Sequence, residues 1–404
     1  MPSPYLTAAQ AAEALNISLP TLYAYVSRGL IRSEAAGSAK RRRRYRAEDV
    51  RALKQRKELR RNPTKAVEGA LHWGEPVMES AITMIADGRL YYHGHDAVAL
   101  AESRSIEEVA ALLWRGDLAV GDALFAKKMR LPPRCLAVRK HLRDIATIEA
   151  LQILISLAAV DDIAGCDLRP AAVAQTGARI LSLMSAFVSG GIGEGESIAQ
   201  GLQSAWTPRK PKAADLINTA LILCADHELN VSSFTARCIA SAGSTPYAVV
   251  VGGLTALQGV KHGRATERVE ALLCEARTPH GVAKVMAAHL KRGDRIPGFG
   301  HPLYPDGDPR GRMLLQAVER NFHKSAALAF ADAACDAAMR LIGDRPSIDF
   351  ALVIAARALG LRADGAVSLF AIGRTVGWLG HAIEQYQRNR IIRPRARYVG
   401  ELPR

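Results

Sequence analysis

The sequence predicts a mainly α-helical protein that begins with a small, basic segment. Three observations support this prediction. Apolar residues recur every three to four positions over most of the chain beyond residue 67, strand patterns are scarce, and positive charge is concentrated near the N-terminus. Because 49% of the 404 residues are hydrophobic and 23% are charged, the chain can bury a large core and divide into two or three domains.

The positive charge belongs mainly to the first part of the chain. Residues 1–65 contain 15 Lys and Arg against 5 Asp and Glu, a net charge of +10, whereas the whole chain carries +15. A nucleic-acid partner is therefore expected for this segment alone, since the remaining residues are only weakly basic for their number.

The first 30 residues show the signals of two short helices separated by a tight turn. Thr7 followed by Gln10 predicts a capping box at the start of a helix that ends near Leu15. Ser18 and Pro20 predict the start of a second helix directly after the turn. Two short helices in this arrangement form the helix-turn-helix pattern.

A basic stretch, KRRRRYRAEDVRAL from Lys40, follows these helices. The whole segment resembles the winged helix-turn-helix of the MerR type, which implies a domain over residues 1–60, a linker at 61–66 and DNA as a partner. On this resemblance the second helix faces a major groove while the arginines lie along phosphates. The expected DNA-binding residues are Thr21, Tyr23, Tyr25, Arg41, Arg42, Arg43 and Arg44. A solvated charge run on a tethered domain is the alternative.

Seven segments of the remaining chain have helical periodicity, and one has the pattern of a hairpin. Helices are expected at residues 106–115, 147–160, 171–188, 215–224, 313–320, 326–341 and 367–384. The hairpin is expected around GRLYYHGHD, at residues 88–96. No repeat of about 20 to 50 residues is evident, which argues against a solenoid.

A charge-free run at residues 238–260 is long enough to span a bilayer, but it contains many small and polar residues. A buried helix is therefore expected there, and no membrane partner. The six cysteines form no CxxC pair, which argues against a disulfide framework and against a metal site. A cytoplasmic protein without a bound metal is expected.

Six segments concentrate histidine, arginine and aspartate in apolar or glycine-rich surroundings, where a solvated surface role is least expected. They are DHELN from Asp226, KHGRATE from Lys261, GFGHPLYPDGDPR from Gly298, SIDF from Ser347, AIGRTVGW from Ala371 and IIRPRARYVG from Ile391. Taken singly, each has a structural alternative, because a lone histidine beside glycine is more often a core or loop residue. Their order along the chain makes chance agreement very improbable.

Taken together, these strings resemble the citrate synthase family over residues of about 75–400. The resemblance implies a mainly α-helical body at residues 67–404, with a large domain and an inserted small domain at roughly 225–340 that closes over the substrates. It also implies a homodimeric acyltransferase that condenses acetyl-CoA with oxaloacetate and water to give citrate and CoA. The coenzyme A ester is then a substrate, and no other cofactor is expected.

This condensation needs a base that removes a weakly acidic methyl proton and a group that stabilises the resulting enolate. The resemblance makes Asp349 the base and makes His262 the hydrogen-bond donor to the thioester oxygen. His301 would polarise the oxaloacetate carbonyl and protonate the new alkoxide. A neutral imidazole suits the task of His262, with its protonation state set by its surroundings.

Oxaloacetate carries two carboxylates, which arginine binds in a two-pronged geometry. The resemblance assigns this role to Arg310 and Arg374 of one subunit and to Arg393 of the partner subunit, with His227 and Asn230 completing the pocket. The glycine-rich loop before the second catalytic histidine is expected to bind CoA and contains Ile296, Pro297, Gly298, Phe299 and Gly300. A plain turn is the alternative reading of that loop.

Three positions depart from the family pattern. Thr266 stands where the family usually has Asn, and Arg264 stands where bacterial members tend to have Gly, which leaves substrate range and rate open. Pro302 replaces a common Arg at a position that varies within the family. The GFGHPLY and GDPR strings also resemble relatives that cleave citryl-CoA, so the direction of reaction stays open.

Two further functions remain as alternatives. A 2-methylcitrate synthase would use propionyl-CoA, which differs by about one methylene, worth only ~1 to 3 kcal/mol of discrimination. A metabolite-sensing DNA-binding regulator would explain the basic N-terminal segment. The presence of Asp349 favours an enzyme, because a sensor has no need for a base.

Overall fold

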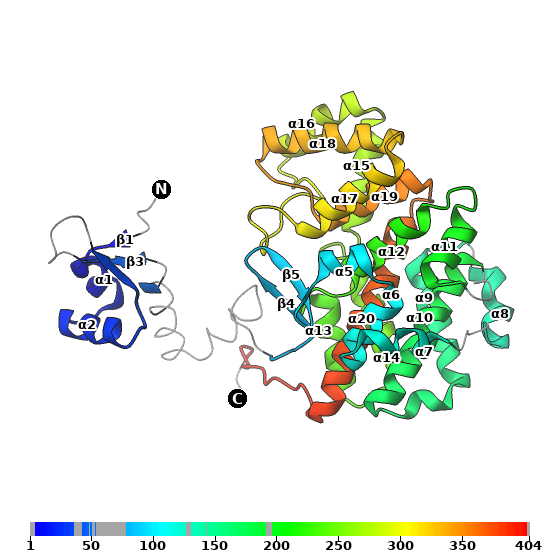
Figure 1. Cartoon of the computed structure of the whole chain (residues 1–404), viewed down its shortest axis with the longest axis horizontal. Coiled ribbons are helices and arrows are strands. Elements are labelled where there is room, and N and C mark those ends of the chain that lie inside the picture. The colour runs from blue at the N-terminus through cyan, green and yellow to red at the C-terminus, as the bar shows by residue number, and fades with distance from the viewer. Residues whose placement is uncertain are drawn as a thin grey trace. The chain divides into compact units, whose positions relative to one another are not determined.

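The computed structural model describes residues 5–35, 43–47, 49, 50, 53, 78–126, 131–142, 144–190 and 196–401. The chain forms two compact units, Met1–Glu79 and Ser80–Arg404 (Figure 1). The predicted linker at residues 61–66 and two of the predicted DNA-binding residues, Arg41 and Arg42, lie outside the described residues.

The N-terminal unit contains the two predicted helices and a small sheet. Its elements are β1 (Tyr5–Leu6), α1 (Ala8–Leu15), α2 (Leu19–Ser27), β2 (Ser33–Ala35) and β3 (Arg43–Arg46). The predicted capping box is present, since the Thr7 side chain accepts from the Gln10 N–H and the Gln10 side chain accepts from the Thr7 N–H. Ser18 caps α2 with a single bond, since its side chain accepts from the Thr21 N–H, so both helix starts follow from local side-chain hydrogen bonds.

The basic string after these helices builds the wing and part of the core. Strand β3 lies between β1 and β2 in an antiparallel sheet, and Tyr45 and Val50 are buried with residues of both helices. Asp49 accepts hydrogen bonds from the backbone N–H, Nε and Nη2 of Arg32 at 2.8 to 3.0 Å. The Tyr, Asp and Val of this string therefore stabilise the fold of the unit.

The second unit begins with the predicted hairpin, extended to three strands. Strand β5 (Arg89–Tyr92) pairs with both β4 (Thr83–Ala86) and β6 (His95–Asp96). The two connecting turns, Asp87–Gly88 and His93–Gly94, have positive φ at both positions, as two-residue hairpin turns require.

The rest of the second unit is helical, and all seven helices predicted from periodicity are present. The longer helices are α5 (Ala97–Ser103), α6 (Ile106–Arg115), α7 (Gly121–Phe125), α8 (Pro133–Arg139), α9 (Thr147–Asp161), α10 (Pro170–Ser189), α11 (Ile198–Trp206), α12 (Ala213–Cys224), α13 (Val231–Ser241), α14 (Pro246–Leu257), α15 (Ala265–Ala276), α16 (Val282–Lys291), α17 (Pro309–Phe322), α18 (Ala326–Leu341), α19 (Ile348–Leu359) and α20 (Gly365–Arg388). The short 3-10 turns are η1 (Leu118–Val120), η2 (Lys140–Leu142), η3 (Ile163–Cys166) and η4 (Pro279–Gly281).

Helix α20 runs through the centre of this unit and packs against α10, α12, α13 and α14 (Figure 1). It is buried along most of its length. Gly377 lets it approach the end of α12, because a Cβ there would lie 2.4 Å from both the Ala225 carbonyl oxygen and Asp226 Oδ1. Helices α15 to α18 gather with α19, which also touches α20 (Figure 1). The side chains of the candidate site come from both groups of helices.

The prediction of one buried helix at residues 238–260 was wrong in its continuity. The run is divided between α13 and α14, because Thr245 accepts a hydrogen bond from Ala248 N–H and caps a new helix that starts at Pro246. Among the described residues, two helices are long and apolar enough to cross a membrane, α10 and α20. Their apolar windows are 61% and 100% buried inside the protein, as in core helices.

Candidate active site

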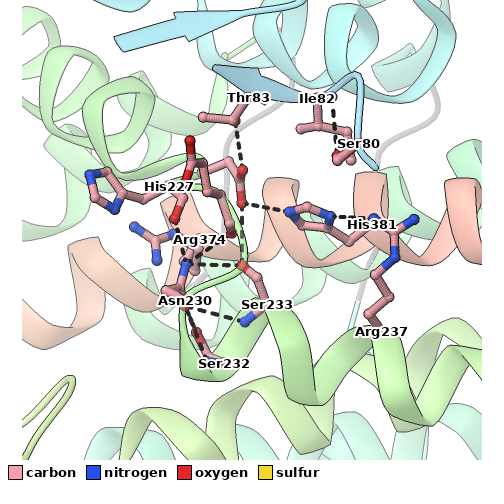
Figure 2. Close-up of polar contacts among 12 residues, drawn as sticks. Ser80, Ile82, Thr83, His227, Asn230, Ser232, Ser233, Arg237, Arg374 and His381 are labelled. Carbon is pink, nitrogen blue, oxygen red and sulfur yellow. Dashed lines mark hydrogen bonds and ion pairs between the residues drawn. The ribbon is translucent and has the colours of Figure 1, made fainter. Parts of the chain in front are cut away.

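The DHELN string forms the turn between α12 and α13, which we call the 226–230 turn (Figure 2). Asp226 is fully buried and begins the turn, and Glu228 has a φ of +50°. Asn230 ends the turn as the cap of α13, since its Oδ1 accepts from the N–H groups of Ser232 and Ser233. These bonds give Asn230 a structural role, and its predicted contact with substrate stays a prediction.

His227 is buried on this turn beside two aromatic rings of the GFGHPLY segment. Its Nε2 lies 3.0 Å from the Tyr304 hydroxyl, and its ring centre is 5.1 Å from that of His301. Burial, reinforced by the charge of Arg310, lowers the pKa of His227 well below its ordinary value. The ring is therefore neutral near pH 7 and can donate or accept one hydrogen bond to a ligand.

Two buried arginines flank these histidines. Arg374, on α20, donates from Nε to the Cys224 carbonyl at 2.7 Å, and burial lowers its pKa. Arg310, at the start of α17, binds both oxygens of Asp308 through Nε and Nη2 at 3.0 and 2.8 Å. Each guanidinium keeps further N–H groups beyond these bonds, and a dicarboxylate anion would compensate their charge.

Asp349 lies in the first turn of α19, close enough to Arg310 and Arg374 for their positive charges to act on its pKa. Burial raises the pKa of Asp349 to about 6, although Arg310 and Arg374 oppose the shift. A carboxylate with a pKa near neutrality is better matched to taking a proton from carbon than one with an ordinary pKa. The backbone N–H of Ile348, the residue before Asp349, donates a hydrogen bond to Asp308. This bond connects the start of α19, which carries Asp349, to the start of α17.

The other two predicted catalytic residues are histidines held neutral. Burial, with the charge of Arg374, lowers the pKa of His262 to about 4, and its Nε2 lies 2.9 Å from Ser232 Oγ. Burial and Arg310 lower the pKa of His301 to about 4. His301 Nδ1 accepts from the Leu303 N–H at 3.2 Å, so the proton of the neutral ring is on Nε2. Both rings can thus act as uncharged donors.

The predicted CoA loop is paired with the segment that leads into Asp349. The Ser347 N–H donates to the Gly298 carbonyl at 2.8 Å, and the Gly300 N–H donates to the Arg345 carbonyl at 2.9 Å. Both glycines have positive φ, and a Cβ at Gly300 would lie 2.7 Å from an Asp344 oxygen. Glycine is therefore required for this path of the backbone. Ile296 is buried, and Pro297 and Phe299 are partly buried.

Arg393 is not part of this cluster within its own chain. It lies beyond α20 in an exposed, irregular segment that runs to residue 401. A contribution from the partner subunit stays a prediction. Arg264, one of the residues that depart from the family pattern, lies at the surface, 3.8 Å from both Glu149 and Glu267. Its positive charge therefore faces these two carboxylates.

The predicted DNA-binding residues of the N-terminal unit have different surroundings. Tyr23 is 52% exposed on α2, whereas Tyr25 packs partly buried against the core of the unit. Thr21 is partly buried and its hydroxyl lies 2.9 Å from Ser18 Oγ. Arg43 and Arg44 are exposed on β3, and Arg44 lies over the Tyr5 ring and 3.4 Å from Glu34.

Sequence reasoning missed several side chains that hold the site together. They are Asp226, Ser232, Arg237, Tyr304, Asp308 and His381. All of them lie inside or next to the sequence strings that carry the family resemblance. Their position near these strings was the only signal in the sequence that could have pointed to them. Within the described ranges, no group of three or more His, Cys, Asp or Glu residues could hold a metal ion.

A mainly helical core brings a partly buried carboxylate, neutral histidines and two buried arginines together in the second unit. The sequence matches the family model described as citrate synthase, C-terminal domain, over residues 70–395, so the chain belongs to the citrate synthase family. Residues 5–58 match a second family model, described as a helix-turn-helix domain.

Relatives of both predicted kinds match most of the chain. Citrate synthase 2 of Bacillus subtilis is 30% identical over 361 residues, covering 83% of this chain and 96% of that protein. A 2-methylcitrate synthase of Shewanella oneidensis is 28% identical over 386 residues, covering 84% of this chain and 97% of that protein. The chain is thus a citrate synthase-family enzyme whose acyl substrate these relatives leave open.

Solved structures share the fold. The crystal structure of citrate synthase from Thermotoga maritima has a TM-score of 0.71 and 28% identity, covering 82% of this chain and 95% of that one. A citrate synthase from Thermoplasma acidophilum, solved as a ternary complex with carboxymethyl coenzyme A and oxaloacetate, has a TM-score of 0.72 and 25% identity, covering 81% and 95%.

Proposed function

We propose that this chain condenses acetyl-CoA with oxaloacetate and water to give citrate and CoA. One observation carries the proposal. Asp349, with a pKa raised to about 6, shares a buried site with neutral His262 and His301 and with the cations Arg310 and Arg374. A base, two neutral hydrogen-bond donors and carboxylate-binding cations are the groups that this reaction needs.

The first step is proton removal. The Asp349 carboxylate takes a proton from the methyl group of the thioester, and the electron pair of that bond moves onto the thioester oxygen. His262 donates a hydrogen bond to the resulting enolate oxygen. This role requires the ring proton on Nδ1, with the Ser232 hydroxyl donating to His262 Nε2 at 2.9 Å rather than to Asn230 Oδ1 at 2.7 Å.

Carbon–carbon bond formation follows. The enolate carbon attacks the oxaloacetate carbonyl, and the alkoxide that forms takes its proton from His301 Nε2. The proton that Asp349 removed from the methyl group balances this transfer and restores the neutral His301 ring. Arg310 and Arg374 hold the dicarboxylate beside His227, where burial strengthens their attraction for the anion. Water then hydrolyses the thioester, which releases CoA as a free thiol.

A thiol-release assay tests this reaction and the acyl preference together. Oxaloacetate should cause acetyl-CoA to release thiol, and the ratio of kcat/KM for acetyl-CoA and propionyl-CoA distinguishes a citrate synthase from a 2-methylcitrate synthase. The absence of oxaloacetate-dependent thiol release from either ester would contradict the proposal.

The working form would be a homodimer in which Arg393 of the partner subunit completes the pocket. Three apolar side chains of the same exposed segment support a partner surface, since Ile391, Tyr398 and Val399 are 66%, 69% and 82% exposed. Sedimentation of the full chain should show a dimer, and truncation after residue 389 should weaken it.

DNA binding by the N-terminal unit is a second function, favoured by its helix-turn-helix match and its arginine-rich strand. Phosphate contacts from Arg43 and Arg44 would make binding strongly dependent on salt. A mobility-shift assay of the full chain at two salt concentrations tests this function. If the full chain does not bind DNA at low salt, the proposed DNA-binding function is wrong and the N-terminal unit is only a tethered domain.

A further inference from the structure

Five buried or half-buried polar residues contact one another in a line that includes the first residue of the 226–230 turn, and Figure 2 labels three of them, Thr83, His381 and Arg237. We call this line the buried polar chain, and its members are Thr83, Asp226, His381, Arg237 and Glu384. None of them belongs to the groups assigned above to proton transfer or substrate binding. Asp226, Arg237 and His381 are fully buried, so each needs a specific reason to be there.

The contacts run continuously from the hairpin to α13. Thr83 Oγ1 donates to Asp226 Oδ2 at 2.6 Å, and His381 Nε2 lies 3.3 Å from the other oxygen, Oδ1. His381 Nδ1 lies 3.1 Å from Arg237 Nη1, which also donates to Glu384 at 2.8 Å. Glu384 in turn accepts from the backbone N–H of Ala81 at 2.7 Å.

These contacts determine the tautomer of His381. A guanidinium can only donate, so His381 Nδ1 must accept the hydrogen bond from Arg237. The ring proton is then on Nε2, which lies 3.3 Å from Asp226 Oδ1 but outside hydrogen-bond geometry, so this contact is electrostatic. Burial alone would raise the pKa of Asp226, but His381, Arg374 and Thr83 lower it below its ordinary value. Asp226 is therefore an ionised acceptor, and its side-chain donors are the hydroxyls of Thr83 and Ser233, while His381 Nε2 lies 3.3 Å from the same carboxylate.

Three residues on one face of α20 contact three successive residues, from Cys224 to Asp226, that lead into the 226–230 turn. Arg374 Nε donates to the Cys224 carbonyl, the Gly377 N–H donates to the Ala225 carbonyl at 2.9 Å, and His381 reaches Asp226. Positions 374, 377 and 381 are one and two helical turns apart, so they share one side of the helix. The residue that follows Asp226 is His227, whose ring enters the pocket.

We propose that His381 is a positioning residue for oxaloacetate binding. Its ring, oriented by the bond from Arg237 to Nδ1, keeps Nε2 3.3 Å from the Asp226 carboxylate and so helps to set the place of His227 opposite Arg374. This inference rests on the proposed function, because it takes the 226–230 turn to be part of the oxaloacetate pocket.

Substitutions that keep or remove the donor and acceptor of His381 test the role. In His381→Gln the amide can donate to Asp226 and accept from Arg237, and oxaloacetate KM should stay within about threefold of wild type. His381→Leu removes both contacts and should raise oxaloacetate KM about tenfold or more, with kcat and acetyl-CoA KM changed much less, since ground-state and transition-state binding are lost together.

Two further variants keep the test decisive. Thr375→Val removes a buried hydroxyl from the same helix, α20. This hydroxyl donates to the Ala371 carbonyl and is not part of the buried polar chain, so the variant serves as the matched control for stability. Thr83→Val removes one donor to Asp226 without changing volume much, and should raise oxaloacetate KM in the same direction by a smaller factor. It decides the question if His381→Leu does not fold, as judged by thermal melting.

The outcomes separate this inference from the proposed function. Wild-type protein without oxaloacetate-dependent thiol release would overturn the proposed function and with it the role of His381. An active wild type together with a folded His381→Leu of unchanged oxaloacetate KM would overturn the positioning role alone. The positioning role would also be overturned if His381→Gln were as impaired as His381→Leu. If the leucine variant does not fold, an unchanged oxaloacetate KM in Thr83→Val would overturn that role.

Discussion

The two units of this chain use arginine in opposite ways. Among the described residues of the N-terminal unit, Arg32 and Arg44 lie at the surface and keep 62% and 47% of their side chains exposed while they pair with carboxylates. In the second unit Arg237, Arg310 and Arg374 are buried, each with a defined partner. Exposed arginines produce a broad field that salt screens, whereas buried ones select a particular anion.

This difference shows why net charge alone is a poor guide to function. The surface arginines dominate the charge count and suggest a nucleic-acid partner. The buried arginines barely alter that count, yet two of them, Arg310 and Arg374, are the proposed carboxylate-binding groups of the enzyme. The predictions below test whether the two sets are functionally separate, beginning with the largest expected effect.

The largest effect is expected at the base between the buried arginines. Asp349→Asn should lower kcat about 10²- to 10⁴-fold, because the proton acceptor is lost. Oxaloacetate binding should persist, because Arg310 and Arg374 remain. Thiol release and titration calorimetry with oxaloacetate measure the two quantities. Near-normal turnover in this variant would show that Asp349 is not the base.

A smaller loss is expected from the arginine of the exposed segment. Arg393→Ala and Arg374→Ala should each weaken oxaloacetate binding, and a mixture of the two variants should regain part of the activity if both arginines reach one pocket from different subunits. Native mass spectrometry must first show that hybrid dimers form. Hybrids without any regained activity would remove Arg393 from the pocket.

The pH dependence of the reaction should follow Asp349. Its pKa of about 6 means that the carboxylate is mostly ionised above pH 6 and protonated below it. Since the base must be ionised to accept a proton, kcat/KM should be level near neutral pH and fall about tenfold per unit below pH 6. A fall that begins only near pH 4 would indicate that the carboxyl titrates as an exposed aspartate does.

Local signals in the sequence predicted the elements of the fold well where a cap was present. The helix at residues 106–115 was predicted from its periodicity with the bounds it has. The structure shows why these bounds are sharp, since Ser105 and Glu108 form a capping box and Gly116 ends the helix in a left-handed conformation. The run at residues 238–260 was taken as one helix, although Thr245 before Pro246 carries the signal for a second start.

The site was predictable only in part. The family resemblance named the candidate catalytic residues, and the structure places partly buried His262, His301 and Asp349 within the influence of Arg310 or Arg374. The hydrogen bonds that hold them there were not predicted. Arg237 and His381 are 144 positions apart on different helices, and helical periodicity cannot reveal which buried polar side chains meet in space.

The smallest effect on catalysis is expected from the surface arginines, and it completes the comparison between the units. Replacing Arg41 to Arg44 by Ala should leave thiol release unchanged, because every group assigned to the reaction lies beyond residue 225. The same change should flatten the salt dependence of DNA binding by up to ~0.9 in log–log slope for each DNA phosphate that the variant no longer neutralises. Arg89→Ala is the matched control, since Arg89 is an exposed arginine of the second unit that pairs with Asp96, and it should leave the slope as it is. An unchanged slope in the quadruple variant would exclude these arginines from any DNA contact. A loss of thiol release in that variant would show that the surface arginines contribute to the enzyme, and the functional separation of the two units would then fail.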